Sequence, residues 1–210
     1  MNDQKQAIAY ANADFEEPHN NFIDLLKLSL GNNFEKRSNT IGIDLGTGAA
    51  DIAIKLALKF PSIKIDAVDG SIAMLDEAKK AISRFGLSDR IYLINSPIQE
   101  ISLAKKDYSI IFSNSLLHHL HDPFVLWKLI KNAKGNPKVF IMDLIRPKNS
   151  KQVEELTNQY AENEPEILRR DFKNSLKAAF TIDEVKLQLY DAELEKLSVR
   201  AVSDRHMVIS

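Results

Sequence analysis

Acidic residues surround a glycine turn in the first half of the chain. The segment IGIDLGTGAADIAIKLA, residues 41–57, reads as a short apolar strand, a glycine turn and a helix. Asp44 precedes Gly46 and Gly48, and Asp69 stands at the end of the next apolar run. Glycines let a ligand come close to the backbone, so the turn is a candidate binding site. The charge of the acids then decides which ligand the turn accepts.

Two ligands fit a glycine turn of this kind, and they differ in charge. A dinucleotide fingerprint has G-x-G-x-x-G and an acid about 20 residues on, and Gly46, Gly48 and Asp69 satisfy it. Its third glycine position is Asp51, however, and with Asp44 it would repel a pyrophosphate by about 1 kcal/mol per charge pair in water. S-adenosylmethionine carries a sulfonium and an ammonium instead, and Asp69 can accept hydrogen bonds from its ribose hydroxyls. The pattern favours S-adenosylmethionine. An NAD-dependent oxidoreductase and a non-catalytic S-adenosylmethionine-binding protein stay open as alternatives.

The elements that must position these acids alternate along the chain. Strands are predicted at 40–45, 63–69, 90–95, 108–114 and 137–145, with helices at 50–60, from Ser71 onward, and after the Asp122-Pro123 start signal. This rhythm predicts a parallel sheet with helices on both faces. The carboxyl ends of its strands, where ligands bind in such sheets, carry the polar residues. The two closing runs, LEKLSVRAV and RHMVIS, are too close together for a parallel crossover and are predicted to pair antiparallel.

The remaining segments predict helical additions around this sheet. Residues 3–15 and 19–30 have helical patterns, residues 147–180 are helical and charged, and TIDE at 181–184 is a capping box. We therefore expect an α/β, Rossmann-like, seven-stranded and mostly parallel sheet with an antiparallel terminal strand and a helical cap. The whole chain is expected to form one domain. Its parts are an N-terminal helical cap at residues 1–38, a cofactor-binding core at 39–146, a helical insertion or lid at 147–180, and a terminal helix with a strand pair at 181–210.

Composition narrows the range of partners. The chain has 210 residues, a formal net charge of −1 and no cysteine. A net charge this close to zero gives the surface no overall positive potential that would attract a polyanion. We therefore expect a small-molecule substrate and no nucleic-acid partner. No apolar run reaches the roughly 20 residues of a membrane span, and the polar start is unlike a signal peptide. We expect a cytoplasmic protein without a membrane partner; the pattern says nothing of the oligomeric state.

Four segments together resemble class I S-adenosylmethionine-dependent methyltransferases. IDLGTGAADIAIKLA is similar to their first motif with Ala50 in the usual third-glycine place, and IDAVDGSIAMLDEAKK is similar to the second. YSIIFSNSLLHHLHDP and PKVFIMDLIRP are similar to the fourth and fifth. The resemblance implies methyl transfer by in-line displacement to a small-molecule acceptor, with S-adenosylhomocysteine as product. It implies a cofactor site made of Tyr10, Asp44, Gly46, Thr47, Gly48, Asp69, Gly70, Ser71, Met74, Asn95, Ser96, Pro97 and Asn114. Members often have an aspartate for the adenine amino group where this chain has Asn95 and Ser96.

Residues that follow the fourth and fifth strands are candidates for the acceptor side. His118, His119 and His121 lie too close in sequence to point at one ion, so no metal site is expected. His119 is the candidate general base, with a water-linked Asp143 as the other choice. His118, Arg146 and Asn174 are the substrate candidates. The run SNSLL after Ser113 lacks the prolines and aromatic ring that amino-directed nucleic-acid methyltransferases use to hold a flipped base.

Overall fold

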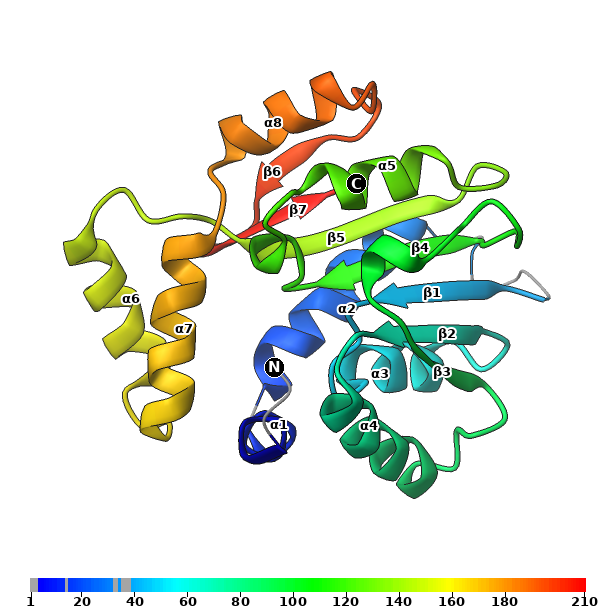
Figure 1. Cartoon of the computed structure of the whole chain (residues 1–210), viewed down its shortest axis with the longest axis horizontal. Helices are drawn as coiled ribbons and strands as arrows, with labels where there is room; N and C mark the ends of the chain where they lie inside the picture. Colours follow the sequence, from blue (N-terminus) through cyan, green and yellow to red (C-terminus); the bar gives the residue numbers. More distant parts are fainter. Residues whose placement is uncertain (1–3, 14, 32–33, 35–38) are drawn as a thin grey trace. The chain divides into compact units, whose positions relative to one another are not determined.

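A seven-stranded sheet organises the chain in the computed structural model, which describes residues 4–13, 15–31, 34 and 39–210 (Figure 1). Its strand order is β3-β2-β1-β4-β5-β7-β6. The strands are β1 (Ile41–Leu45), β2 (Lys64–Asp69), β3 (Ile91–Asn95), β4 (Ile110–Asn114), β5 (Lys138–Leu144), β6 (Val199–Ala201) and β7 (His206–Ile209).

Strand β1 lies between β2 and β4, and both pairings are parallel. Strand β7 pairs antiparallel with β5 and with β6, because the short turn between β6 and β7 leaves no room for a crossover. The predicted fold class, a mostly parallel sheet with an antiparallel terminal strand, is confirmed. Because β1 to β4 pair in parallel, Asp44, Asp69, Asn95 and Asn114 come at the same edge of the sheet.

Residue contacts divide the chain into two compact units, and the first is Met1–Asn114 with Asn132–Phe140. Its helices are α1 (Gln4–Asn12), α2 (Glu16–Leu30), α3 (Asp51–Lys59), α4 (Ile72–Arg84) and the 3-10 turn η1 (Ile98–Glu100). Helix α2 packs beside α3, and its Phe22 ring meets Phe140 edge-on at 5.1 Å. Helix α1 lies against α4 (Figure 1). Of the predicted N-terminal cap, residues 1–3, 14, 32, 33 and 35–38 lie outside the described part.

The second unit is Ser115–Lys131 with Ile141–Ser210. Its helical elements are the 3-10 turn η2 (Leu117–His119), α5 (Phe124–Lys131), α6 (Ser150–Ala161), α7 (Glu166–Ala178) and α8 (Ile182–Asp191). Helices α6 and α7 lie side by side (Figure 1), and their apolar residues form a cluster with β5: Leu144, Val153, Leu156, Phe172, Leu176 and Ala179. The predicted capping box is present, with Thr181 and Glu184 each accepting a backbone N–H of the other.

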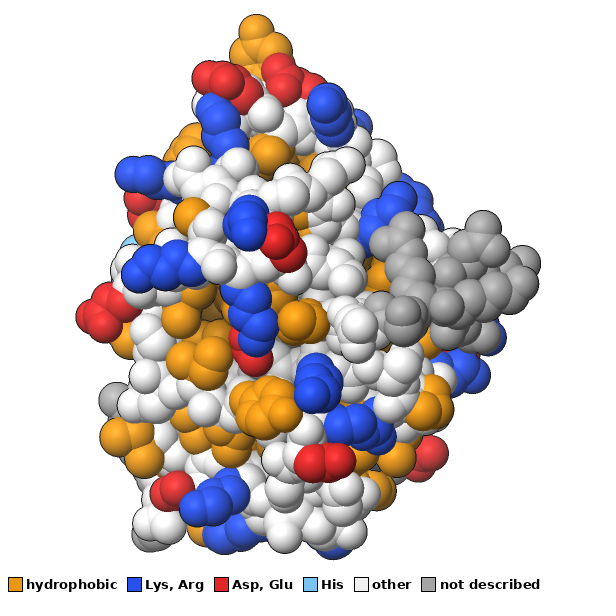
Figure 2. All heavy atoms as spheres, turned by 90° about the vertical axis from the view of Figure 1, so that its right-hand side faces the viewer, with side chains coloured by type: hydrophobic (Ala, Val, Ile, Leu, Met, Phe, Trp, Pro, Cys, Tyr) orange, Lys and Arg blue, Asp and Glu red, His pale blue; other side chains and the backbone are white. Residues whose placement is uncertain are grey.

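The surface carries charges of both signs. On the face in Figure 2, Lys and Arg side chains are interspersed with Asp and Glu side chains, and apolar side chains adjoin one another in places. None of the helices that the structure describes has the length and apolar character needed to cross a membrane.

The sequence predicted one domain with four segments, at residues 1–38, 39–146, 147–180 and 181–210. This division stays a prediction.

Candidate functional site

The glycine turn after β1 has an alternating backbone conformation. Gly46, Gly48 and Ala50 all have positive φ angles, of 74°, 55° and 67°. This left-handed conformation costs an L-residue roughly 1–2 kcal/mol, which glycine avoids. The third-glycine place therefore has a conformation that favours glycine, and Ala50 adopts it at a cost in strain. A Cβ at Gly48 would meet no atom within 4 Å, so the turn leaves open space beside this residue.

The backbone N–H groups of this turn are largely used within the protein. Gly46 and Thr47 both donate to the carbonyl of Val68 at 2.9 Å, and Gly48 donates to Oδ2 of Asp69 at 2.9 Å. Ala50 donates to the carbonyl of Thr47 at 2.9 Å. A dinucleotide turn needs such donors for its pyrophosphate. Here they already have acceptors, which removes the main attraction that this turn would offer to a phosphate.

Asp44 and Asp69 are both at this turn but have different surroundings. Asp44 is 1% exposed and accepts one hydrogen bond, from Oγ1 of Thr47 at 2.7 Å. Burial raises the pKa of Asp44 to about 7; the hydrogen bond from Thr47 opposes the rise, and the charges of Asp69 and Asp51 add to it. Asp69 is partly exposed and accepts from two backbone groups, the N–H of Gly48 at 2.9 Å and that of Ser71 at 2.8 Å. Asp51 is the first residue of α3, where burial raises its pKa.

Further predicted cofactor residues lie around the ends of β2 and β3, among them Asn95 and Ser96 at the place of the adenine contact. Ser71 caps α4 by accepting the N–H of Met74 at 3.3 Å, and Met74 itself is buried. Asn95 is exposed, and its side-chain amide donates to the carbonyl of Asp69 at 3.1 Å. Gly70 packs near Pro97 without a close contact, and Ser96 donates through its backbone N–H to Asp69. These residues are therefore neighbours, as the sequence predicted from their strand ends.

Asn114 and Tyr10 are the remaining predicted cofactor residues. Oδ1 of Asn114 is a buried acceptor without a hydrogen-bond partner among the described residues. Such an atom is costly unless a ligand or water donates to it. The ring of Tyr10 lies 6.0 Å from that of Phe15, at the start of an aromatic row that continues to His19 at 5.5 Å.

The histidine turn η2, in the second unit, has a carboxylate at its centre. Asp143 is 1% exposed and accepts three hydrogen bonds: from Leu117 N–H at 2.7 Å, from Leu144 N–H at 2.8 Å and from Nδ1 of His118 at 2.6 Å. Since the carboxylate accepts, the proton between them is assigned to Nδ1 of His118, which leaves Nε2 as an acceptor. The sequence did not predict this pair, because its members are 25 residues apart in the chain.

His119 lies next to this pair. Its ring centroid is 4.1 Å from that of His118, and it keeps an exposed edge. Partial burial, and after it the neighbouring His118, lower the pKa of His119 to about 4. The ring is therefore neutral at pH 7 and can accept a proton.

The other two acceptor-side candidates have different surroundings. The guanidinium of Arg146 makes a salt bridge with Glu184, so its charge is already engaged within the second unit. Asn174 is exposed on α7, the helix that contacts η2. Sequence reasoning missed the partner of Arg146 because Glu184 also belongs to the capping box, which explained it without a second contact.

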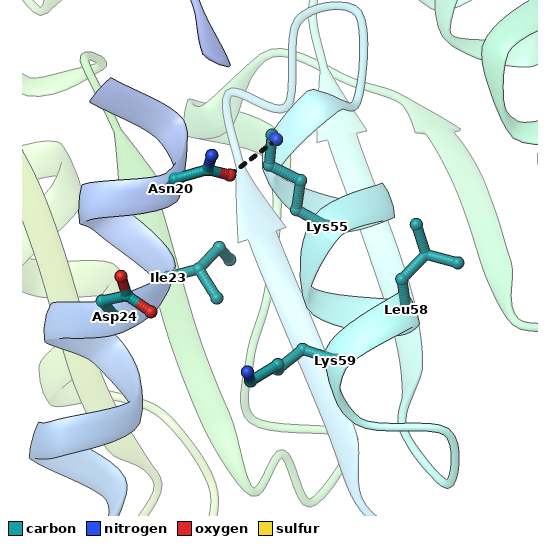
Figure 3. A pocket seen from close by; sticks show the side chains of 6 residues that line it. All are labelled: Asn20, Ile23, Asp24, Lys55, Leu58 and Lys59. Atoms are coloured by element: carbon teal, nitrogen blue, oxygen red, sulfur yellow. Dashed lines mark hydrogen bonds between the residues drawn. The ribbon is translucent and has the colours of Figure 1, made fainter. Parts of the chain in front are cut away.

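One cavity in the first unit lies apart from the predicted residues. It has a volume of about 440 Å³ and is lined by residues of α2 and α3: Asn20, Ile23, Asp24, Lys55, Leu58 and Lys59 (Figure 3). Lys55 donates to Oδ1 of Asn20 at 2.8 Å across it. No group of three or more acidic or histidine side chains among the described residues is arranged to hold a metal ion.

A comparison with protein families decides the assignment. The family model described as Methyltransferase domain matches residues 36–195. The chain belongs to this methyltransferase family. The match covers the glycine turn with Asp44 and the histidine turn with Asp143. The predicted recognition of a class I methyltransferase is confirmed.

Individual relatives match this methyltransferase over shorter segments or at lower sequence identity. It is 35% identical over 72 residues to a release factor glutamine methyltransferase of Rhodopirellula baltica, covering 34% of this chain and 24% of the relative. It is 23% identical over 146 residues to a malonyl-[acyl-carrier protein] O-methyltransferase of Legionella pneumophila, covering 68% and 50%. The chain thus spans half or less of these curated relatives. A putative S-adenosyl-L-methionine-dependent methyltransferase of Methanococcus maripaludis has the same fold, with a TM-score of 0.72, 20% identity and coverage of 100% and 94%.

Proposed function

We propose that this methyltransferase binds S-adenosylmethionine at the glycine turn and transfers its methyl group to a small-molecule acceptor. S-adenosylmethionine supplies an electrophilic methyl group on a cationic sulfur. The observation that carries the proposal is the combination of three acids, Asp44, Asp51 and Asp69, with backbone donors that are already used. A turn of this kind attracts a cation and offers little to a diphosphate.

The residues of the turn fit such a ligand. Asp69 is partly exposed and, held by two backbone N–H groups, is positioned to accept from ribose hydroxyls. Asp44 provides a carboxylate for the cationic amino-acid end. The orphan acceptor Oδ1 of Asn114 gains a donor when an ammonium or a hydroxyl arrives. The open space at Gly48 lets the ligand come close to the backbone.

On the acceptor side, we assign proton removal to the histidine turn. Asp143 is buried with its oxygens taken by three N–H donors, so it serves to orient His118 rather than to take a proton from a substrate. His119 keeps an exposed edge and is neutral at pH 7, so it can accept a proton, and its pKa of about 4 makes it a weaker base than a histidine with the usual pKa. A base of this kind is needed when the acceptor is a hydroxyl or an ammonium and not when it is a thiolate or carboxylate.

The charge of the protein favours a small molecule as the methyl acceptor. The net charge is −1, and the face in Figure 2 mixes both signs, as suits a protein without a polyanionic partner. The relatives include methyltransferases named for a protein acceptor and for a carrier-bound acyl group, so the test must separate these classes.

The experiment is label transfer from S-adenosylmethionine carrying a labelled methyl group. The full chain is incubated with the small-molecule fraction and, separately, with the protein fraction of a cell extract, and His119→Gln serves as a matched variant. We expect label in a small molecule, reduced by about 100- to 10,000-fold in the variant, the usual range for a general base. Label found only in proteins contradicts the small-molecule assignment, and no transfer in either fraction contradicts the activity.

A further inference from the structure

Helix α7 brings a carboxylate to the histidine turn η2. We propose that Asp171 on this helix binds the methyl acceptor through a cationic nitrogen, which makes the acceptor an amine. The assignment rests on the proposed function and narrows its small-molecule acceptor to one chemical class.

The position of Asp171 links it to the candidate base. Helix α7 contacts η2 within the second unit, and Asp171 lies in the second turn of this helix. Its side chain is 17% exposed, so the carboxylate is largely covered but still accessible. Burial and the neighbouring His118 lower the pKa of His119, while the charges of Asp143 and Asp171 raise it. Asp171 and His119 therefore lie on adjoining elements, within reach of each other's charge.

The cation beside Asp171 in the chain holds it only loosely. Nε of Arg170 lies 3.8 Å from Oδ1 of Asp171, which is too long for a hydrogen bond. The Arg170 side chain is 67% exposed. An exposed ion pair of this kind contributes little free energy, so a ligand cation can compete with Arg170 for the carboxylate.

Three cations of α7 and of the segment after β5 already have partners. Lys173 makes a salt bridge with Glu154, and Arg169 donates to a side-chain amide oxygen of α6 at 2.6 Å. Arg146 makes a salt bridge with Glu184. An anionic acceptor would have to displace these partners, whereas a cationic acceptor meets the carboxylate of Asp171.

The charge of Asp171 also favours a nucleophile that becomes positive during the reaction. A neutral amine that takes a methyl group becomes an ammonium, and a nearby carboxylate stabilises this developing charge. A phenolate or carboxylate nucleophile would be repelled by the same carboxylate. Electrostatics at α7 therefore favour nitrogen over an anionic oxygen as the acceptor atom.

Methyl transfer to such an acceptor requires the loss of one proton from nitrogen. The bound ammonium gives this proton to a ring nitrogen of His119, which passes it to water. The nitrogen lone pair then forms the bond to the methyl carbon, while the carbon–sulfur bond breaks and its electron pair stays on sulfur. The methylated nitrogen is again a cation and stays paired with Asp171.

Label transfer into a chemically blocked extract tests the acceptor class. The full chain is incubated with methyl-labelled S-adenosylmethionine and the small-molecule fraction of a cell extract. A second portion of the fraction is first treated with an acetylating N-hydroxysuccinimide ester, which blocks amines, and then with hydroxylamine, which frees any acetylated hydroxyl groups. The control portion receives the same reagents after the ester has been hydrolysed. We expect transfer in the control portion and its loss in the blocked portion.

Two variants test whether Asp171 is the binding group. Asp171→Asn keeps the shape of the side chain and removes its charge, so we expect about a 10- to 100-fold loss of label transfer, as for a hydrogen bond to a charged group. Asp171→Glu keeps the charge and should retain most of the transfer. Asp191→Asn, at the exposed end of α8, is the matched control and should transfer label like the parent. All of these proteins should bind S-adenosylhomocysteine equally, because the changes lie on the acceptor side.

The outcomes distinguish the acceptor class from the proposed function. Equal transfer in the blocked and control portions overturns the amine and leaves methyl transfer to a small molecule standing. The role of Asp171 is overturned if Asp171→Asn transfers label like the parent, if it loses S-adenosylhomocysteine binding as well, or if Asp171→Glu is equally impaired. If the parent transfers no label to any compound of the extract, the proposed function fails together with the amine.

Discussion

The glycine turn and the histidine turn each contain an aspartate that is 1% exposed near the end of a strand, and the two aspartates differ in their donors. Asp143 accepts from two backbone N–H groups and from His118. Asp44 accepts from one hydroxyl. Burial alone therefore does not define the role of an acid. A buried carboxylate with a full set of donors supports local structure, and one without them is suited to receive a ligand cation.

The pH dependence of stability should reveal this difference most strongly. The pKa of Asp44 rises from 3.8 to about 7 on folding, so its ionised form destabilises the fold. The penalty is absent below about pH 4, grows as the pH rises to about 7 and is constant above. At about 1.4 kcal/mol per unit, its upper limit is about 4 kcal/mol.

Urea unfolding of the parent and of Asp44→Asn across pH 4 to 8 measures that penalty. The variant should gain stability relative to the parent as the pH rises through this window. Two stability curves that stay parallel from pH 4 to pH 8 would contradict the account of Asp44.

Asp143→Ala should have the opposite effect. The substitution leaves two backbone N–H groups and Nδ1 of His118 without an acceptor in a buried place. We expect a loss of about 3 kcal/mol in the free energy of unfolding, from about 1–3 kcal/mol for each abandoned buried group with partial relaxation. Urea unfolding at pH 7 is the measurement, and Asp191→Ala, at the exposed end of α8, is the control. A loss no larger than that of the control would remove the contrast between the two aspartates.

Asp69→Ala should affect binding more than folding. The side chain is partly exposed, and its proposed partners are the ribose hydroxyls, so we expect about a 100-fold loss of affinity, near 3 kcal/mol for two charge-assisted hydrogen bonds. Titration with S-adenosylhomocysteine checks the value, and Asp76→Ala on the exposed face of α4 should leave affinity unchanged. An affinity within threefold of the parent would exclude Asp69 from the site.

Ala50→Gly should give the smallest change in stability among these variants, at the glycine turn. Ala50 has a φ of 67°, and glycine relieves the strain of that conformation. We expect a gain of about 1 kcal/mol in stability with little change in affinity, because the left-handed penalty for an L-residue is of that order. A loss of stability on thermal unfolding would show that the methyl group of Ala50, which is fully buried, contributes more by packing.

Much of the fold could be predicted from the sequence because its signals are local. The strand patterns, the Ser71 cap and the Thr181–Glu184 capping box each depend on residues within a few positions, and the structure has all of them. The nearness of Asp69 to the glycine turn could be anticipated as well, since parallel strands bring their carboxyl ends to one edge.

The side-chain partners of the histidine turn could not be predicted in the same way. The contact between His118 and Asp143 depends on the depth at which η2 sits beside the end of β5, which no sequence period encodes. For the same reason the sequence favoured His119 and a water-linked Asp143 over an oriented His118. The salt bridge of Arg146 with Glu184 also joins distant segments and emerged only from the fold.

The charge preference of the glycine turn is tested most directly by parallel calorimetric titrations of the full chain with S-adenosylmethionine and with NAD at pH 8, where Asp44 is ionised. Because the three acids attract a cation and four of the turn's N–H groups are already used, we predict that S-adenosylmethionine binds at least 100-fold more tightly, a difference of about 2.7 kcal/mol. Equal affinities, or tighter binding of NAD, would contradict the account.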